Sequence, residues 1–348
     1  MSRYIRAIYA PLVGLRMSNQ ELLDTISRWL QKRQVDDAEK IALFDFIRLL
    51  LIGHRHRYNQ AGEEFLSMNG FAEHAAAFAR AIEESTSAIA AEILADPPQR
   101  PFDAVFGVSS EGQLLPGIAE RMAAKLPDLI GRTATQMDLG NGGCTASVRA
   151  IQLVQNLSAE FRNVLIVVME PTSTLLDPKS TGRSNWQGIC TFGDGCAGAW
   201  ISDEPGEGAV ELGKLVSWRG DAIDLIQWDW GSDYYRFAIA ELEQFEVKVR
   251  SQILEAMDVL KPEKDPGAAW ALHPAGIMLL LSLAKKLGLA KTALEPSLSH
   301  FRAYSNMSSV SILHILKNII GCANPGQPIR WLSMGAGFHV ACGAGVRV

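Results

Sequence analysis

The sequence predicts an α/β protein in which strands and helices alternate along the chain. Short apolar runs at 104–108 and 164–169 have the length and composition of buried strands. Longer segments with helical start and stop signals separate them. At 348 residues and 48% hydrophobic content, the chain can bury one large core or two equivalent ones. This alternation favours a mainly parallel sheet covered by helices.

Local signals support the expected elements of the first half. Ser18 with Glu21 forms a capping-box pattern that opens a helix. Pro97-Pro98 ends a long helix, and Asn141-Gly142-Gly143 breaks the chain before another one. We expect strands at 3–9, 104–108 and 164–169, and helices at 18–32, 38–51, 70–94, 114–125 and 145–158.

The second half repeats the alternation after a polar segment at 171–185, which contains Pro178, Gly182 and several serines. We expect this segment to separate two units, 1–175 and 186–348, and no shorter internal repeat is visible. The elements expected in the second unit are strands at 188–201, 209–218, 268–272, 329–334 and 340–346, and helices at 234–260, 276–287 and 308–320.

Charge and composition exclude several classes of function. A net charge of −5 with mixed signs argues against a nucleic-acid surface. The short basic run His54–Arg57 favours a solvated turn over a site for an acidic partner or phosphate. No histidine or cysteine spacing typical of a metal site occurs, so we expect no metal.

The expected location is the cytoplasm. Five cysteines without paired spacing fit a reducing compartment, and the four other than Cys144 are interpreted as small buried residues. The N-terminus does not resemble a signal peptide. The longest apolar run, at 276–283, is far shorter than the roughly 20 residues that a membrane-spanning helix needs.

The residue that points most directly to chemistry is Cys144. It follows Asn141-Gly142-Gly143 and precedes an apolar helical segment. A thiol at a turn into a helix N-terminus lies near free backbone N–H groups and the positive end of the helix dipole, which favour a thiolate. A buried cysteine behind glycines is also a common packing residue, so this pattern alone leaves both interpretations open.

Two further polar residues stand at junctions in the second half. His273 follows the strand expected at 268–272, and Asn306 precedes the helix expected at 308–320. Such junctions converge at one end of an α/β sheet. A cysteine, a histidine and an asparagine together supply a nucleophile, a base or hydrogen-bond donor, and a neutral amide donor.

With these residues the sequence resembles the thiolase-fold condensing enzymes, and most closely the type III polyketide synthases (chalcone and stilbene synthase kin) and the ketoacyl synthase III group. The resemblance rests on five segments in the right order around Cys144. Those segments are Ile52–Tyr58, Gly193–Ala199, His273-Pro274 with Gly276, Asn306–Ser309 and Gly335–Phe338.

The resemblance implies a thiolase fold, in which two pseudo-equivalent α/β halves form α-β-α-β-α layers. It also implies that Cys144 is the thioester-forming nucleophile. His273 would pair with the thiolate as an ion and later donate to an enolate, and Asn306 would be the second enolate donor; for Asn306 a helix cap is the alternative. Backbone N–H groups of Cys144 and of Ala336 or Gly337 would form the oxyanion hole. Phe338 and Trp230 would contact substrate, and for the aromatic cluster around Trp230 ordinary packing is the alternative.

The function implied by the resemblance is that of an acyltransferase performing decarboxylative Claisen condensation. An acyl thioester would load Cys144, and a malonyl thioester would lose carbon dioxide and attack the acyl group. Ala275 and Ser305 depart from glycines of the type III pattern, and the glycine- and proline-rich C-terminal loop of iterative enzymes is absent. These departures place repeated extension in doubt and leave the acyl transfer untouched.

The same resemblance implies no metal or redox cofactor. Coenzyme A or an acyl carrier protein would serve as substrate carrier, and the protein would be a homodimer with a role in secondary metabolism. Two alternatives stay open. One is non-decarboxylative transfer from Cys144 to another nucleophile, and the other is a non-catalytic partner subunit of a condensing complex.

Overall fold

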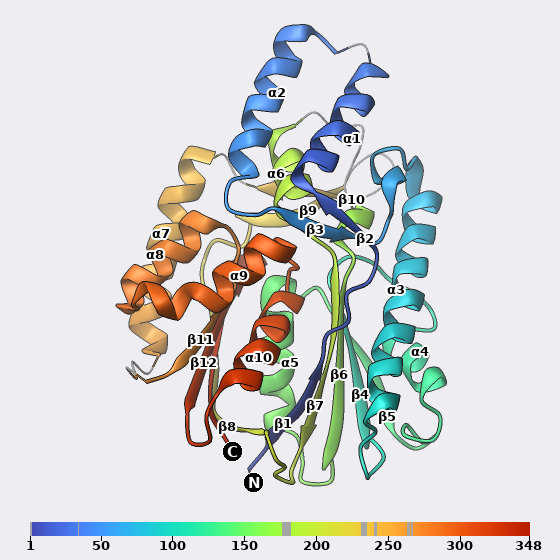
Figure 1. Ribbon diagram of the computed structural model, residues 1–348, viewed down its shortest axis with the longest axis vertical. Helices are drawn as coiled ribbons and strands as arrows, with labels where there is room; N and C mark the ends of the chain where they lie inside the picture. The colour runs from blue at the N-terminus through green and yellow to red at the C-terminus, as the bar shows by residue number, and fades with distance from the viewer. Residues whose placement is uncertain are drawn as a thin grey trace.

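The computed structural model describes residues 2–33, 35–175, 182–230, 235–239, 242–262, 265 and 267–348. Its centre is a nine-stranded mixed sheet with the order β11-β12-β13-β8-β1-β7-β6-β4-β5. Two small antiparallel sheets, β2-β3 and β9-β10, lie in the upper half of the molecule in Figure 1, below helices α1 and α2.

The strands have the following bounds: β1 Tyr4–Tyr9, β2 Leu15–Ser18, β3 His56–Asn59, β4 Ala104–Ser109, β5 Thr135–Gly140, β6 Asn163–Glu170, β7 Gly195–Ser202, β8 Val210–Arg219, β9 Ile226–Trp230, β10 Tyr235–Ile239, β11 Ala269–Leu272, β12 Pro328–Gly335 and β13 His339–Arg347. The α-helices are α1 Asn19–Gln31, α2 Asp37–Leu50, α3 Gly70–Ala95, α4 Ile118–Lys125, α5 Ala146–Gln155, α6 Arg183–Thr191, α7 Leu242–Leu260, α8 Ile277–Leu287, α9 Glu295–Tyr304 and α10 Val310–Cys322. Short 3-10 helices include η2 Gly143–Thr145 and η5 Ala336–Phe338.

The sheet has two halves that meet where β1 pairs with β8, through Tyr4 opposite Glu211 and Ile5 opposite Val210. Helices α3 and α4 cover the outer face of one half, and α7 and α8 cover the outer face of the other. Helices α5 and α10 lie side by side between the halves (Figure 1). This arrangement is the predicted five-layer α-β-α-β-α order.

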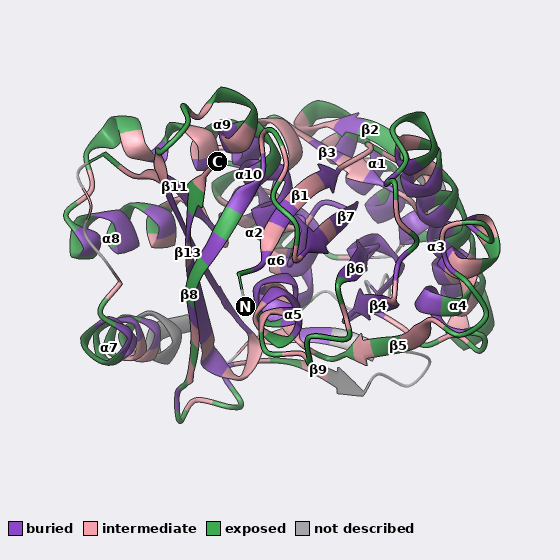
Figure 2. Cartoon of the chain, turned by 90° about the horizontal axis from the view of Figure 1, so that it is seen from below, coloured by how far each residue is buried: buried purple, intermediate pink, exposed green. Residues whose placement is uncertain are grey.

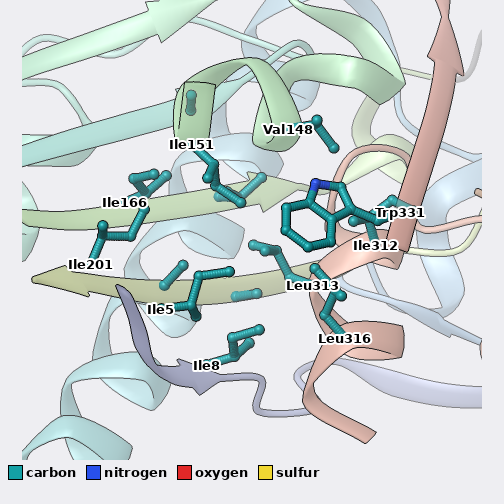
Figure 3. Close-up of a cluster of buried hydrophobic side chains, with 14 of the residues drawn as sticks. Ile5, Ile8, Val148, Ile151, Ile166, Ile201, Ile312, Leu313, Leu316 and Trp331 are labelled. Atoms are coloured by element: carbon teal, nitrogen blue, oxygen red, sulfur yellow. The ribbon is translucent and has the colours of Figure 1, made fainter. Parts of the chain in front are cut away.

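The largest hydrophobic core fills the layer around α5 and α10. Ile151 of α5 and Leu313 of α10 point into it beside strand residues Ile5, Ile166 and Ile201 (Figure 3). The view from below in Figure 2 shows that buried residues dominate α5 and the central strands. The hydroxyl of Ser147, in the first turn of α5, donates to the carbonyl of Ser309 just before α10 over 2.6 Å. The N-termini of the two central helices are therefore held together.

The prediction of a mainly parallel sheet is wrong. Only β11-β12, β6-β4 and β4-β5 pair in parallel, whereas the neighbours from β12 to β6 are antiparallel. A βα alternation does not specify strand direction, because β6 and β7 pair antiparallel although α6 lies between them in the sequence. Strand β7 lies after the boundary predicted at 175–186, yet it pairs with β1 and β6 of the first half. Two separable units therefore stay a prediction.

Two segments have a secondary structure different from the one expected. Residues 183–191 form helix α6, although a strand was expected from residue 188. Its buried residues Trp186, Ile189 and Cys190 have helical spacing and pack into the cluster beneath α1 and α2. The helix expected at 234–260 begins only at Leu242, because β10 pairs with β9 ahead of it. The sequence analysis also missed β2, β3, β5, β9 and α9.

Helix α1 begins as predicted. The Ser18 hydroxyl accepts from the backbone N–H of Glu21, and the Glu21 carboxylate accepts from the N–H of Ser18. Within the described ranges, none of the helices is long and apolar enough to span a membrane. Across the same residues, no group of three or more metal-ligating side chains is gathered at one point.

We predict that Gly343→Ala destabilises the protein, whereas Gly131→Ala is nearly neutral. A Cβ at Gly343 in β13 would lie 2.2 Å from the ring of Trp331, which is fully buried on the neighbouring strand; at Gly131 it would meet nothing within 4 Å. Overpacking of this kind costs about 1–3 kcal/mol. Urea unfolding of both variants measures the difference, and equal midpoints would contradict the packing argument.

Candidate active site

Cys144 is held at the entrance to α5 by contacts from three directions. The N–H of Gly143 donates to the Ser110 hydroxyl over 2.9 Å, and the Ser333 hydroxyl donates to the Cys144 carbonyl over 2.5 Å. Gly143 has φ +54°, which favours glycine. Gly335 passes so close that a Cβ there would lie 2.8 Å from the Cys144 nitrogen. The predicted turn ahead of the cysteine is confirmed.

A cavity of about 130 Å³ opens beside Cys144. One wall is apolar and includes Phe192, Trp228, Phe237, Leu279 and Phe338. The polar residues gather near the thiol; they are Ser110, Glu111, Asn306 and Ser308. A cavity of this composition accepts an apolar group at one end and polar chemistry at the other.

Asn306 reaches the same cavity from the bend between α9 and α10. Its Oδ1 accepts the backbone N–H of Ser308 over 2.9 Å. Because only the oxygen of an amide can accept, this contact assigns the orientation and leaves the amide nitrogen as the donor available to a bound molecule. Ser305 and Ser308 flank it at φ +65° and +49°, a strained conformation for serine. This contact lies in the bend ahead of α10, which begins without a side-chain cap, so Asn306 is not the cap of that helix; among the described residues its amide nitrogen makes no hydrogen bond and remains a donor.

His273 lies just after β11, and its backbone N–H donates to the backbone carbonyl of Leu332 over 2.9 Å. The side chain is buried, and it is not among the residues that line the cavity. Neither ring nitrogen has a hydrogen-bond partner in the described part of the chain. Burial lowers the pKa of His273 to about 3, so the imidazole is neutral. A neutral imidazole can act as an N–H donor, and both this role and the ion pair with Cys144 stay predictions.

The thiol of Cys144 is also neutral in this structure. Burial is the main cause that raises its pKa to about 12, and the charge of Glu170 adds to the shift. A hydrogen bond from Ser308 and the residue's own backbone N–H act in the opposite direction. Desolvation thus acts against the stabilisation of the thiolate that the helix N-terminus is expected to provide, and the nucleophilic role of Cys144 stays a prediction.

The sequence analysis missed two buried carboxyl groups next to the thiol. Glu111 follows β4 and Glu170 ends β6, and both are buried. The single N–H of Ser110 lies 3.0 Å from Oε2 of Glu170 and 3.3 Å from Oε2 of Glu111. Burial and the Glu170 charge raise the pKa of Glu111 well above its usual value. A signal was present, since both residues stand at the carboxyl ends of adjacent parallel strands.

Only some of the remaining predicted site residues line the cavity. Ala336 and Phe338 line the cavity, and Gly337, at φ +66°, does not. The oxyanion hole of Cys144 with Ala336 or Gly337 stays a prediction. Trp230 ends β9, but its side chain lies outside the described residues. Trp228 lines the cavity instead, and its indole N–H donates to the Ser110 carbonyl over 3.0 Å.

Two interpretations of ordinary residues need correction. The basic run His54–Arg57 is no solvated turn, because Arg57 is buried and its guanidinium donates to the carbonyls of Ile189, Cys190 and Phe192. It thereby fixes the end of α6 next to the cavity wall. Cys190, Cys196 and Cys342 are buried as expected, but Cys322, in the last turn of α10, is exposed.

Comparisons with known proteins agree with this geometry. Residues 241–347 match the family model of the chalcone and stilbene synthases, C-terminal domain, and residues 137–216 match that of 3-oxoacyl-[acyl-carrier-protein] synthase III. The chain is 28% identical over 257 residues to a Bacillus subtilis protein named "Putative chalcone synthase", covering 69% of each. It is 26% identical over 248 residues to a 3,5-dihydroxyphenylacetyl-CoA synthase of Streptomyces toyocaensis, covering 67% of this chain and 63% of the relative.

Solved structures share the fold over the whole chain. The 1,3,6,8-tetrahydroxynaphthalene synthase of Streptomyces coelicolor, a bacterial type III polyketide synthase, superposes with a TM-score of 0.84 at 20% identity, covering 99% of both chains. The type III polyketide synthase domain of a Dictyostelium type I/III hybrid gives 0.83 at 16% identity, covering both chains fully. The chain is thus similar to the thiolase-fold condensing enzymes of the type III polyketide synthase and ketoacyl synthase III group, which are acyltransferases that catalyse decarboxylative Claisen condensation of an acyl thioester with a malonyl thioester.

Proposed function

We propose that Cys144 carries the acyl group and that Asn306 and His273 act on the malonyl partner. The observation that supports this most is the position of Cys144 and Asn306 on one cavity, with the Asn306 amide nitrogen left free by its Oδ1 contact. The nucleophile comes from the segment 138–148, and the amide donor to the malonyl partner comes from the segment 305–309. The hydrogen bond from the Ser147 hydroxyl to the Ser309 carbonyl holds the two segments together at the start of α5 and α10.

In the first half-reaction, the Cys144 sulfur attacks the thioester carbonyl and the carrier thiol leaves. The backbone N–H groups of Cys144 and Ala336 are the proposed donors to the developing oxyanion, with Gly337 as the alternative to Ala336. The apolar wall around Trp228, Phe237 and Phe338 then receives the acyl chain.

In the second half-reaction, a malonyl thioester binds against the same wall and loses carbon dioxide. The enolate oxygen that forms accepts a hydrogen bond from the Asn306 amide and, in the proposed role of His273, from its neutral imidazole. The carbanion attacks the acyl-Cys144 carbonyl and releases a β-ketoacyl product. Coenzyme A or an acyl carrier protein enters as substrate carrier, and we propose no metal or redox cofactor.

We further propose that the protein is a homodimer that meets at the β5 edge of the sheet. Within the described residues, β5 pairs only with β4, which leaves its other edge open. The side chain of Met137, on this strand, is 52% exposed. Leu115, which precedes α4 in the sequence, is 96% exposed. An open, partly apolar edge is a typical surface for a second copy. We also propose a cytoplasmic location for the protein.

We predict that Cys144→Ala abolishes self-acylation and leaves the fold intact. Among the described residues that line the cavity, the other possible nucleophiles are hydroxyls and the Glu111 carboxyl, which are far weaker than a thiolate. Intact-mass spectrometry after incubation with a panel of acyl thioesters measures the adduct. Cys322→Ala, at an exposed site, is the matched control. A covalent acyl mass on Cys144→Ala would refute the assignment.

We predict that Asn306→Asp impairs malonyl decarboxylation far more than acylation. The aspartate can still accept the N–H of Ser308, so the bend is retained, but the donor to the enolate is lost. Loss of one such donor costs about 2.7–4 kcal/mol, or roughly 10²–10³ in rate. Release of labelled carbon dioxide from malonyl-CoA is compared with Cys144 loading. Equal losses in both half-reactions would show that the role of Asn306 is structural.

We predict that Met137→Asp dissociates the dimer. A carboxylate on the open edge of β5 disfavours strand pairing between copies. Sedimentation should give twice the 38.0 kDa chain mass for the unaltered protein and the single mass for the variant. Val259→Asp, at a residue 60% exposed on α7, is the control for adding a surface charge. A monomeric unaltered protein would contradict the proposal.

A further inference from the structure

A buried carboxyl group that the proposed half-reactions do not use lines the cavity beside Cys144. Glu111 is 2% exposed and stands just beyond the end of β4, at the carboxyl edge of the sheet. The cavity has a largely apolar wall, and none of the described residues that line it carries a positive charge. Glu111 is therefore a polar group of the site whose task the condensation steps leave open.

The hydrogen bonds that the chain offers to this carboxyl are long. The Ser109 hydroxyl lies 3.4 Å from Oε2 of Glu111, and the Ser110 N–H lies 3.3 Å from the same oxygen. Ordinary hydrogen bonds of these kinds are about 2.7–3.0 Å long. The Ser110 N–H also lies closer to Glu170, at 3.0 Å. The donors of the described residues therefore satisfy the Glu111 carboxyl poorly, although buried polar groups normally have a good partner.

The backbone is held on both sides of Glu111. Ahead of it, the carbonyl of Ser110 accepts the indole N–H of Trp228 over 3.0 Å. After it, Gly112 packs so closely on α3 that a Cβ there would lie 2.8 Å from the buried ring of Phe78. A residue fixed in this way loses little conformational freedom when a ligand binds to it, so Glu111 is preorganised for recognition.

The surroundings favour the neutral form of this carboxyl. Burial is the main cause that raises the pKa of Glu111 well above its usual value, and the Glu170 charge adds to the shift. A neutral carboxyl offers one O–H donor together with acceptor oxygens. It therefore matches a ligand group that can also donate and accept, such as a hydroxyl or an amide. A plain hydrocarbon chain packed against Glu111 would leave the carboxyl unpaired, which costs free energy.

We propose that Glu111 selects the starter that loads Cys144, by hydrogen bonding to a neutral polar group, a hydroxyl or an amide, on the acyl chain. This inference rests on the proposed function and deepens it, because it names the class of acyl thioester that the site prefers. The preferred starter carries a polar substituent, and an unsubstituted fatty acyl group is the disfavoured alternative. Glu111 binds the substrate and takes no part in the bonds that form and break.

The polar substituent should lie a short way along the chain from the thioester. The hydroxyl of Ser110 accepts the N–H of Gly143 over 2.9 Å, so the loop that carries Glu111 touches the residue just before Cys144. Glu111 is the next residue after Ser110 in the sequence. The rest of the acyl group can still pack on the apolar wall of the cavity. A starter of this class thus satisfies both the carboxyl and the wall.

The test compares acyl thioesters that differ only in one hydroxyl group. One pair is β-hydroxybutyryl-CoA with isovaleryl-CoA, and the other is ω-hydroxyhexanoyl-CoA with heptanoyl-CoA; in each, a hydroxyl takes the place of a methyl group. In at least one pair, the hydroxylated member should load Cys144 about 10-fold more efficiently, because one net hydrogen bond corresponds to a change of that order. Intact-mass spectrometry under single-turnover conditions measures the loading. Equal loading within both pairs, or faster loading from the hydrocarbon members, would overturn the proposal.

Two variants of Glu111 test whether this residue recognises the hydroxyl. Glu111→Leu replaces the carboxyl by an apolar group of similar size and should reverse the preference by about 10-fold, because the hydroxyl is then buried without a partner. Glu111→Gln still offers a donor and an acceptor and should keep the preference for the hydroxylated member. It provides the comparison if the leucine variant fails to fold. An unchanged preference in a folded Glu111→Leu protein, or a reversed preference in Glu111→Gln, would contradict the assignment.

A matched control separates Glu111 from the general polarity of the cavity. Gln187→Leu removes a polar side chain that lines the same cavity from α6, and this variant should keep the preference for the hydroxylated member. A reversal as large as that of Glu111→Leu would overturn the proposal. An unaltered protein that loads no acyl thioester on Cys144 would instead defeat the proposed function, whereas loading without discrimination defeats only this inference. All proteins compared carry Cys322→Ala to remove the exposed thiol.

Discussion

The packing of α5 against α10 is the contact on which the rest of the structure depends. Both helices are enclosed between the two halves of the sheet, and the Ser147 hydroxyl ties their N-terminal ends through the Ser309 carbonyl. Cys144 stands at the start of one helix, and Asn306 and Ser308 stand just before the other. Burial of the helices is driven by their apolar faces, so the hydrophobic core itself brings the nucleophile and the donor to one cavity.

This placement has an electrostatic consequence. A site in the central layer is dry, and desolvation favours the neutral forms of the Cys144 thiol, the His273 imidazole and the Glu111 carboxyl. The Glu170 carboxyl accepts hydrogen bonds from the Ser110 N–H and the Ser309 hydroxyl, and these donors offset part of the cost of burying it.

Backbone strain is concentrated at the same place. Asn141 and Gly143 before the cysteine, and Ser305 and Ser308 around Asn306, all have positive φ. Such conformations cost about 1–3 kcal/mol each for residues other than glycine, and they persist only where the surroundings hold them. Here the holding contacts are the hydroxyl of Ser110 on Gly143 and the hydroxyl of Ser305 on the Thr191 carbonyl. The two bends are thus kept open toward the cavity.

Local patterns in the sequence predicted much of this. The capping box at Ser18, the buried runs of β4 and β6, and the glycine turn ahead of Cys144 each depend on neighbours within a few residues. The motifs around Cys144, His273 and Asn306 indicated the resemblance to the condensing enzymes, because each motif is a short contiguous segment. Other features depend on residues distant in the sequence, so only the tertiary structure decided them.

Packing partners set the strand directions and the helical state of α6. They also set the burial of Arg57 and the neutral state of His273. The meeting of Glu111, Glu170 and Ser308 at the thiol is of the same kind, because β4, β6 and the start of α10 become neighbours only when the two halves close around the central helices.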